Sequence, residues 1–397
     1  MQKLSVFFKY GLYTCKLLGS VLNQTELAFV PQNINLSYLY QFQSLHNVTS
    51  AVYLSLKPFY DVEQIKKYET DYKMNLLREA RFEIAGQQLY AALEKECIPF
   101  IVLKGAVLKD LYPIPALRYF TDYDIYIGDR SSDVKKVMLS LGYDYDHDTE
   151  TDMDFIKKPS LHFEMHYSLF TDKYDFGGYF NNPFDKAVLR EGSSYGYVLR
   201  NEDCFIYVLA HLYKHFTDGG CGIKQFMDIY VMMQKWSLNM GYIQSELQKI
   251  GLDGFLETTI KLNSFLFDSA EADNDLKQIA DYVFNNGTFG NVKNSMALEY
   301  AQNDVGAKKA FGLYKVKYFI NRWQLSFSGM KNQYQILSKV PFLLPFCYIH
   351  KLFRVIFFRR DVLKTQIRDI NDFSNDYSNY IDHILEISNA RIKDSNK

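Results

Sequence analysis

Two aspartates separated by one residue lie within an apolar run of the chain. Asp122 and Asp124 belong to Arg118–Ile127 (RYFTDYDIYI), where polar and apolar residues alternate as in a β-strand. Successive strand side chains point to opposite faces, so both carboxylates share one face and Tyr123 points to the other. A separation of about 7 Å suits one or two hard divalent cations. An edge strand with a solvated polar face is the alternative that the pair alone leaves open.

A second run, Leu161–Leu169 (LHFEMHYSL), alternates even more regularly. Its apolar residues occupy one face of the predicted strand, and His162, Glu164 and His166 occupy the other. A strand with an apolar back and a His, Glu, His front suits the floor of a polar site. A solvated antiparallel strand is the structural alternative.

A glycine-containing turn precedes both runs. Cys97–Leu103 predicts a short strand that ends at Lys104-Gly105, and Ala106–Leu111 predicts the start of a helix. Backbone N–H groups at a helix start favour an anion, and Lys104 adds a positive charge. Arg118 is a further candidate for holding a phosphate. A structural turn and a surface arginine are the alternatives.

Two more histidines, His211 and His215, are four residues apart in a predicted helix. Positions i and i+4 share a helix face, which is a metal-ligand spacing, but Leu212 stands where zinc metalloproteases carry glutamate. Packing or hydrogen bonding is the alternative role. These two residues, with His162 and His166, are four of the eight histidines in the chain. Their concentration in two segments favours a shared site.

Helical periodicity surrounds these segments on both sides. It predicts a mostly helical N-terminal region at residues 1–95, an α/β core at residues 96–200, and a mostly helical C-terminal region at residues 201–397. Within the core, Asp133–Leu141 is a further predicted helix, with Ser131 and Ser132 as N-cap candidates. The sequence therefore predicts an α+β protein.

Composition excludes several classes of protein. The 45 basic and 46 acidic residues give a net charge of −1, which argues against a protein that coats nucleic acid. The five cysteines are scattered and form no CxxC pair, which favours a reducing, cytoplasmic compartment. The N-terminus does not resemble a signal peptide, and no apolar run reaches the roughly 18 residues of a membrane span.

The segment from Val340 to Arg360 combines bulky apolar residues with basic ones. It could lie peripherally on an anionic membrane surface or dock a partner helix. A buried helix with a basic end is the alternative.

Taken in order, these motifs resemble a known family. The run LKGAVLKDLYPIPALRYFTDYDIYI, then LGY, HFEMH, and HLYKH with KQFMDIY is similar to the uncharacterised bacterial nucleotidyltransferases, over about residues 75 to 235. The resemblance implies a small nucleotidyltransferase-like mixed β-sheet core with extensive helical flanks. It also implies transfer of a nucleotidyl group from an NTP to a hydroxyl or phosphate acceptor.

The resemblance carries roles to individual residues. It implies that Asp122, Asp124 and Glu164 are catalytic and bind Mg²⁺ or Mn²⁺, and that Lys104 and Gly105 contact the nucleotide phosphates. We assign Arg118 to the same nucleotide-binding group. The turn departs from the usual pattern of the nucleotidyltransferase superfamily, because Gly105-Ala106 stands where Gly-Ser or Gly-Gly is usual. The turn therefore lacks the serine hydroxyl that would contact a phosphate.

Two other functions remain open at this point. One is a metal-dependent hydrolase with His162, His166, His211 and His215 as ligands; in a nucleotidyltransferase the same residues would contact or support the substrate. The other is a non-catalytic binding protein that retains the fold.

Overall fold

The computed structural model describes residues 4–27, 34–288, 290–302, 314–315, 318, 330, 334–358, 364, 367–368 and 370–391. The region before the sheet is helical, as predicted. Its helices are α1 (Phe7–Leu22), α2 (Leu36–Leu45), α3 (Thr49–Leu56) and α4 (Lys66–Lys95).

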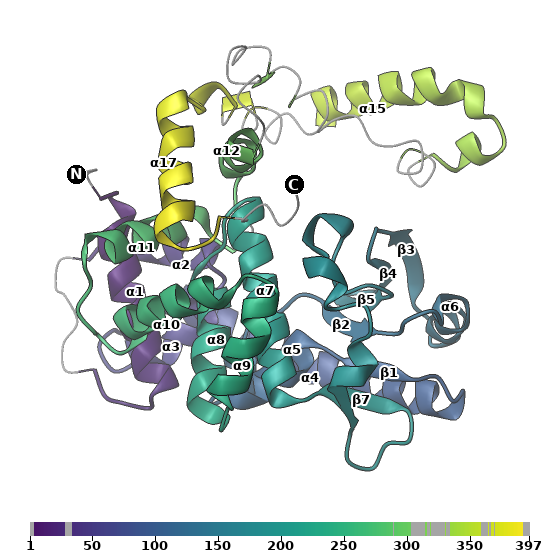
Figure 1. Cartoon of the computed structure of the whole chain (residues 1–397), viewed down its shortest axis with the longest axis horizontal. Coiled ribbons are helices and arrows are strands. Elements are labelled where there is room, and N and C mark those ends of the chain that lie inside the picture. Colours follow the sequence, from purple (N-terminus) through teal and green to yellow (C-terminus); the bar gives the residue numbers. More distant parts are fainter. Residues whose placement is uncertain are drawn as a thin grey trace.

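The region after the sheet is also helical where it is described. Its helices are α7 (Asn201–Asp218), α8 (Ile223–Lys235), α9 (Met240–Lys249), α10 (Asp253–Phe267), α11 (Asn274–Asn286), α12 (Val292–Gln302), α15 (Leu344–Phe358) and α17 (Asn375–Ile387). In Figure 1, α7 to α9 lie between the sheet and the group formed by α1, α2, α10 and α11.

The predicted basic and apolar segment at 340–360 is mostly α15, and Arg359 and Arg360 lie outside the described residues. Phe346 and Ile349 are exposed on this helix, which lies apart from the sheet in Figure 1. Among the helices that are described, none has the length and apolar character needed to cross a membrane. Contact of this segment with a membrane surface or a partner stays a prediction.

A seven-stranded mixed sheet forms the core, in the order β3-β4-β5-β2-β1-β7-β6. The strands are β1 (Phe100–Val102), β2 (Tyr123–Tyr126), β3 (Asp144–Asp148), β4 (Asp152–Lys157), β5 (Leu161–His166), β6 (Ala187–Leu189) and β7 (Gly196–Leu199). β2 pairs with β5 in parallel and with β1 antiparallel, so it is an interior strand. The edge-strand alternative for Asp122 and Asp124 is therefore wrong.

Each face of the sheet packs against different helices. Ile125, Phe163 and Met165 point to one face and pack with residues of α4 and of α6 (Ser131–Ser140). Ile101 and Tyr126 point to the opposite face and join the larger core that contains residues of α7 and α8. The alternation predicted for the two strands is confirmed, because Asp124 and Glu164 belong to this second face.

Local boundaries differ from the sequence prediction in four places. α6 begins at Ser131 rather than Asp133 and its N-cap is Arg130, so the prediction of Ser131 or Ser132 as N-cap is wrong. The Asp122 strand begins only at Tyr123, because the 3₁₀ turn Pro115–Leu117 and an irregular stretch precede it. The helix expected at Ala106–Leu111 is instead the five-residue α5 (Lys104–Leu108) followed by a 3₁₀ turn, Lys109–Leu111. Strands β3, β6 and β7 were not predicted, since β3 is polar and β6 has only three residues.

The apolar back of β5 provides a test of what holds the site in place. Phe163 is fully buried, and its ring packs against Tyr123 at 5.0 Å and Tyr143 at 5.2 Å between ring centroids. Replacing Phe163 with alanine should lower the free energy of unfolding by about 3–5 kcal/mol, because it leaves a cavity behind the strand.

The measurement is urea unfolding followed by circular dichroism. Leu139→Ala is the matched control, because Leu139 is 51% exposed on α6 and should change stability by no more than about 0.5 kcal/mol. Equal losses in the two variants would contradict the assignment of Phe163 to the core.

Candidate functional site

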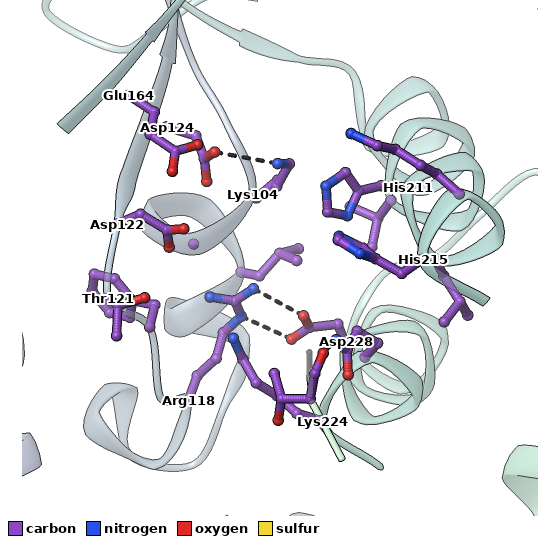
Figure 2. Close-up of a pocket in the computed structure, with 18 of the residues that line it drawn as sticks. Lys104, Arg118, Thr121, Asp122, Asp124, Glu164, His211, His215, Lys224 and Asp228 are labelled. Atoms are coloured by element: carbon purple, nitrogen blue, oxygen red, sulfur yellow. Dashed lines mark hydrogen bonds and ion pairs between the residues drawn. The ribbon is translucent and has the colours of Figure 1, made fainter. Parts of the chain in front are cut away.

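A polar pocket lies between the Asp124 face of the sheet and helices α7 and α8. Its cavity measures about 280 Å³. The chemistry-bearing residues that line it are Lys104, Gly105, Arg118, Asp122, Asp124, Asp152, Glu164, His166, His211, Lys214, His215, Lys224 and Asp228. Figure 2 shows the carboxylates of the sheet on one side and the histidines of the helices on the other, with Lys104 between them.

Three carboxylates stand side by side on this face of the sheet. Asp124 on β2 is in register with Glu164 on β5, and Glu164 is in register with Asp154 on β4. We call Asp124, Glu164 and Asp154 the acidic row. Like charges on directly opposite strand positions repel, so the fold must offset this repulsion. Asp124 and Glu164 line the pocket together with Asp122, just before β2, whereas Asp154 lies outside its lining.

Asp124 is stabilised as an anion by two neighbours. Lys104 Nζ lies 3.2 Å from Asp124 Oδ1, and His166 Nε2 lies 3.0 Å from the same oxygen. Burial alone would raise the pKa of Asp124, but Lys104 and His166 outweigh it and hold that pKa well below its usual range. Asp124 therefore stays ionised at neutral pH.

Glu164 is in the opposite situation. Burial first, and then the charges of Asp124 and Asp122, raise the pKa of Glu164 to about 9. Glu164 is therefore protonated at neutral pH while no cation is bound.

Ligand atoms of Asp124, Glu164 and His166 lie within 4.8 Å of one another, and Asp122 lines the same pocket outside that group. Two adjacent carboxylates with a third nearby form an oxygen-rich donor set, which fits a hard divalent cation such as Mg²⁺.

Lys104 is the first residue of α5, just after β1, and this position brings it to Asp124 in the acidic row. Lys104 has a positive φ of 26°, and a Cβ atom at position 105 would lie 3.1 Å from Arg118 Nη1. Glycine at 105 therefore allows close approach of the arginine to the turn. α5 is only five residues long. Its dipole is correspondingly small, so the positive charge of the pocket comes mainly from side chains.

Arg118 is buried, with 6% of its surface exposed, which excludes the surface alternative. Its Nε and Nη2 atoms each donate a hydrogen bond of 2.8 Å to Asp228 on α8, and the Tyr112 hydroxyl also donates to Asp228. Nη1 points towards Gly105. Arg118 thus links the sheet to α8 and still presents one nitrogen near the turn, so its contact with a phosphate stays a prediction.

Asp228 and Lys224 line the pocket but were given no role from the sequence. They are four residues apart on α8, in a helix whose other residues Ile223, Phe226, Met227 and Ile229 are buried and apolar. That spacing of two charged residues within an apolar helix was the available signal. Their partners could not be inferred, because Arg118 is 110 residues away in the sequence.

The four candidate histidines separate into two locations. His166, His211 and His215 line the pocket, and the rings of His211 and His215 meet edge to face with centroids 4.4 Å apart. Burial and then Lys104 depress the pKa of both residues, to about 3 for His215, so both imidazoles are neutral. His162 lies outside the pocket lining, near Asp154.

Comparison with known proteins identifies the family. A family described as "Uncharacterised nucleotidyltransferase" matches residues 32–268, which is more than half of the chain. The chain therefore belongs to this family. Neither the curated proteins nor the solved structures contain a match to it. The matched region extends from α2 to α10 and includes every residue that lines the pocket except Thr288.

The buried pair of Arg118 and Asp228 yields a prediction about stability. Asp228→Ala should lower the free energy of unfolding by about 3–5 kcal/mol, because it leaves a buried guanidinium without its carboxylate. Asp133→Ala is the control, since Asp133 pairs with Arg130 on the surface and should cost at most about 1 kcal/mol.

Thermal and urea unfolding of the double variant Arg118→Met, Asp228→Leu complete the test. Much of the lost stability should return, because no unpaired charge remains in the interior. A double variant as unstable as Asp228→Ala would contradict the ion-pair interpretation.

Proposed function

Starting from membership of this nucleotidyltransferase family, we propose that the protein transfers a nucleotidyl group from an NTP to a hydroxyl or phosphate acceptor, with the help of a divalent metal ion. The observation that carries the proposal is the pairing of Asp124 with Glu164, in register on parallel strands, opposite the lysines of the pocket. A pocket lined by carboxylates on the sheet and by lysine side chains near them suits a triphosphate with a bound metal ion.

Asp122, Asp124 and Glu164 are the residues that would hold Mg²⁺ or Mn²⁺. Carboxylate oxygens are the ligands that these hard cations prefer. The ion would supply positive charge to the phosphate oxygens and so reduce their repulsion of an incoming nucleophile. Its charge would also lower the pKa of Glu164 and favour the ionised carboxylate.

Lys104, Arg118 and Lys224 would position the phosphates. Lys104 lies between the acidic row and α7, next to the ring of Tyr207. Arg118 is held rigidly by its two bonds to Asp228, which reduces the entropy lost when Nη1 binds an anion. Lys224 has no ion-pair partner within the part of the chain that the structure describes.

The chemical step forms one bond and breaks another. The acceptor oxygen forms a bond to the α-phosphorus, and the bond from that phosphorus to the oxygen bridging to the β-phosphate breaks. Pyrophosphate leaves, and the proton of a hydroxyl acceptor passes to a carboxylate oxygen of the site. Holding both reactants in this geometry is the main contribution that the pocket makes.

The neutral imidazoles of His211 and His215 would support the substrate rather than repel a cation. The hydrolase hypothesis would need these residues as metal ligands. Within the described residues, however, neither belongs to a group of three ligand atoms at metal-binding spacing. The proposed cytoplasmic location agrees with the five cysteines, which are all free thiols.

The carboxylates provide the first functional prediction. The double variant Asp122→Asn, Asp124→Asn should weaken Mg²⁺-dependent NTP binding and lower transfer of an α-labelled nucleotide by at least about a hundredfold, since metal charge stabilisation is worth several kcal/mol. Isothermal titration with and without Mg²⁺ measures binding without requiring a known acceptor.

Asp129→Asn is the matched control, because Asp129 is an exposed residue beyond the end of β2. It should bind the metal-bound nucleotide as the unmodified protein does. Unchanged Mg²⁺-dependent binding in the double variant would refute the proposed role of the two aspartates.

Lys224 provides a prediction about pH. Burial, and then Arg118, lower the pKa of Lys224 to about 8, while the carboxylates around the pocket act in the opposite direction. The ammonium is present below this pKa and is lost as the pH rises through it. NTP affinity should therefore fall when the pH changes from one unit below to one unit above about 8.

Lys224→Met should remove that part of the pH dependence and weaken NTP binding at the lower pH by roughly ten- to 150-fold, the worth of one charge-assisted contact. Lys136→Met, on the exposed surface of α6, is the control. The same decline with pH in the Lys224 variant would assign the titration to another group. The charged groups that influence the pKa of Lys224 are Arg118, Asp228, Asp122 and Asp124.

A further inference from the structure

We propose a second metal site, outside the nucleotide pocket, in which Asp154, His147 and His162 bind one transition-metal ion such as Zn²⁺. The site lies at the other end of the acidic row from Lys104 and does not depend on nucleotidyl transfer. None of these three residues lines the pocket described above.

Two imidazoles flank the carboxylate of Asp154. His147 Nε2 lies 3.4 Å from Asp154 Oδ2, and His162 Nε2 lies 3.4 Å from Asp154 Oδ1. Two ligand atoms bound to one zinc ion, each about 2.0–2.2 Å from the metal, are separated by a similar distance in a tetrahedral site. Each histidine therefore has this spacing from Asp154, but on a different oxygen of the carboxylate, so one shared ion requires the two imidazoles to turn towards each other.

The main-chain register places the two histidines at Asp154. Tyr145 pairs with Phe155 and Asp148 with Met153, so Asp146 and His147 together face Asp154 across a β-bulge. Bulges re-aim side chains and are frequent beside functional sites.

On the other side of β4, Glu164 is directly opposite Asp154, and His162 is two residues before it on β5. Side chains from three neighbouring strands thus converge on one carboxylate.

One carboxylate oxygen of Asp154 is buried without a hydrogen-bond partner among the described residues. Asp154 is only 7% exposed, and the oxygen concerned is Oδ1. His162 is near this oxygen but without hydrogen-bond geometry. A buried carboxylate oxygen without a partner is costly, and a bound cation would satisfy it.

The ligand chemistry favours a transition metal over Mg²⁺ here. Two imidazoles and a carboxylate are a common donor set for zinc, whereas Mg²⁺ prefers oxygen ligands. Asp146, His147 and Asp154 form one group of ligand atoms within 4.8 Å, and Asp154, His162 and Glu164 form another, so Asp154 is the residue that links the two histidines. Asp146 can complete the coordination without a residue of the nucleotide pocket. The exposed fractions of the His147 and His162 side chains, 45% and 32%, leave the ion an entry path.

The test is a zinc titration of the chelator-treated full chain in excess Mg²⁺, against a chromophoric competitor. One Zn²⁺ per chain is expected, with a rise in the melting temperature because the ion binds the folded state. Asp154→Asn, His147→Gln and His162→Gln should each weaken binding by at least about tenfold and remove that rise. Co²⁺ should give the visible absorption of a tetrahedral site in the unmodified protein and not in these three variants.

Three controls separate this site from other zinc-binding groups. Asp124→Asn removes a carboxylate of the nucleotide pocket, His383→Gln an exposed histidine of α17, and Cys97→Ser an exposed thiol. All three should retain the zinc affinity of the unmodified protein.

The results that would overturn the proposal are equally definite. Asp154→Asn, folded by circular dichroism, with unchanged zinc affinity would refute the site. Loss of binding in any control as large as in the three ligand variants would assign the zinc to another location. Neither result bears on Mg²⁺-dependent nucleotide binding, so the two proposals fail independently.

Discussion

The repulsion within the acidic row is the constraint around which this structure is organised. Asp124, Glu164 and Asp154 occupy matching positions on three adjacent strands, where like charges destabilise a sheet. The three carboxyl groups have different surroundings. Lys104 and His166 contact Asp124, whereas burial and neighbouring charges raise the pKa of Glu164. Two histidines flank Asp154. Such an arrangement is costly without a ligand and favourable with cations, which is the expected character of a binding site.

The opposite face of the sheet provides the rigidity that this arrangement needs. Phe82 of α4 packs against Tyr123 and Phe163, and the Tyr123 hydroxyl is hydrogen-bonded to that of Tyr90. Asp124 and Glu164 are each the immediate neighbour of one of these buried aromatic residues along its strand. Fixing the aromatic side chains therefore fixes the direction of the carboxylates, and close packing behind the strands lets them be held together despite their charge.

Local patterns predicted the two strands and the faces of their side chains, because alternation has a period of two residues and needs no tertiary information. Lys104 was assigned to the nucleotide phosphates, and its contact with Asp124 was not predicted, because it depends on how the start of α5 packs against β2. The bond between Arg118 and Asp228 was beyond prediction, since it depends on how α8 docks against the sheet. The polar strand β3 was missed for a similar reason: its exposed residues carry no hydrophobic pattern, and its pairing with β4 defines it.

The helical flank after the sheet is part of the site rather than a covering of it. His211 and Lys214 come from α7, and Lys224 and Asp228 from α8, so much of the basic wall lies outside the predicted core at residues 96–200. The turn Gly105-Ala106 lacks the hydroxyl of a Gly-Ser turn, and α5 is too short to add much dipole. Lys214 of α7 and Lys224 of α8 bring positive charge to the pocket instead. A bound triphosphate would consequently contact the sheet and the helices at once, and its negative charge would strengthen the same junction that Arg118 and Asp228 already hold together.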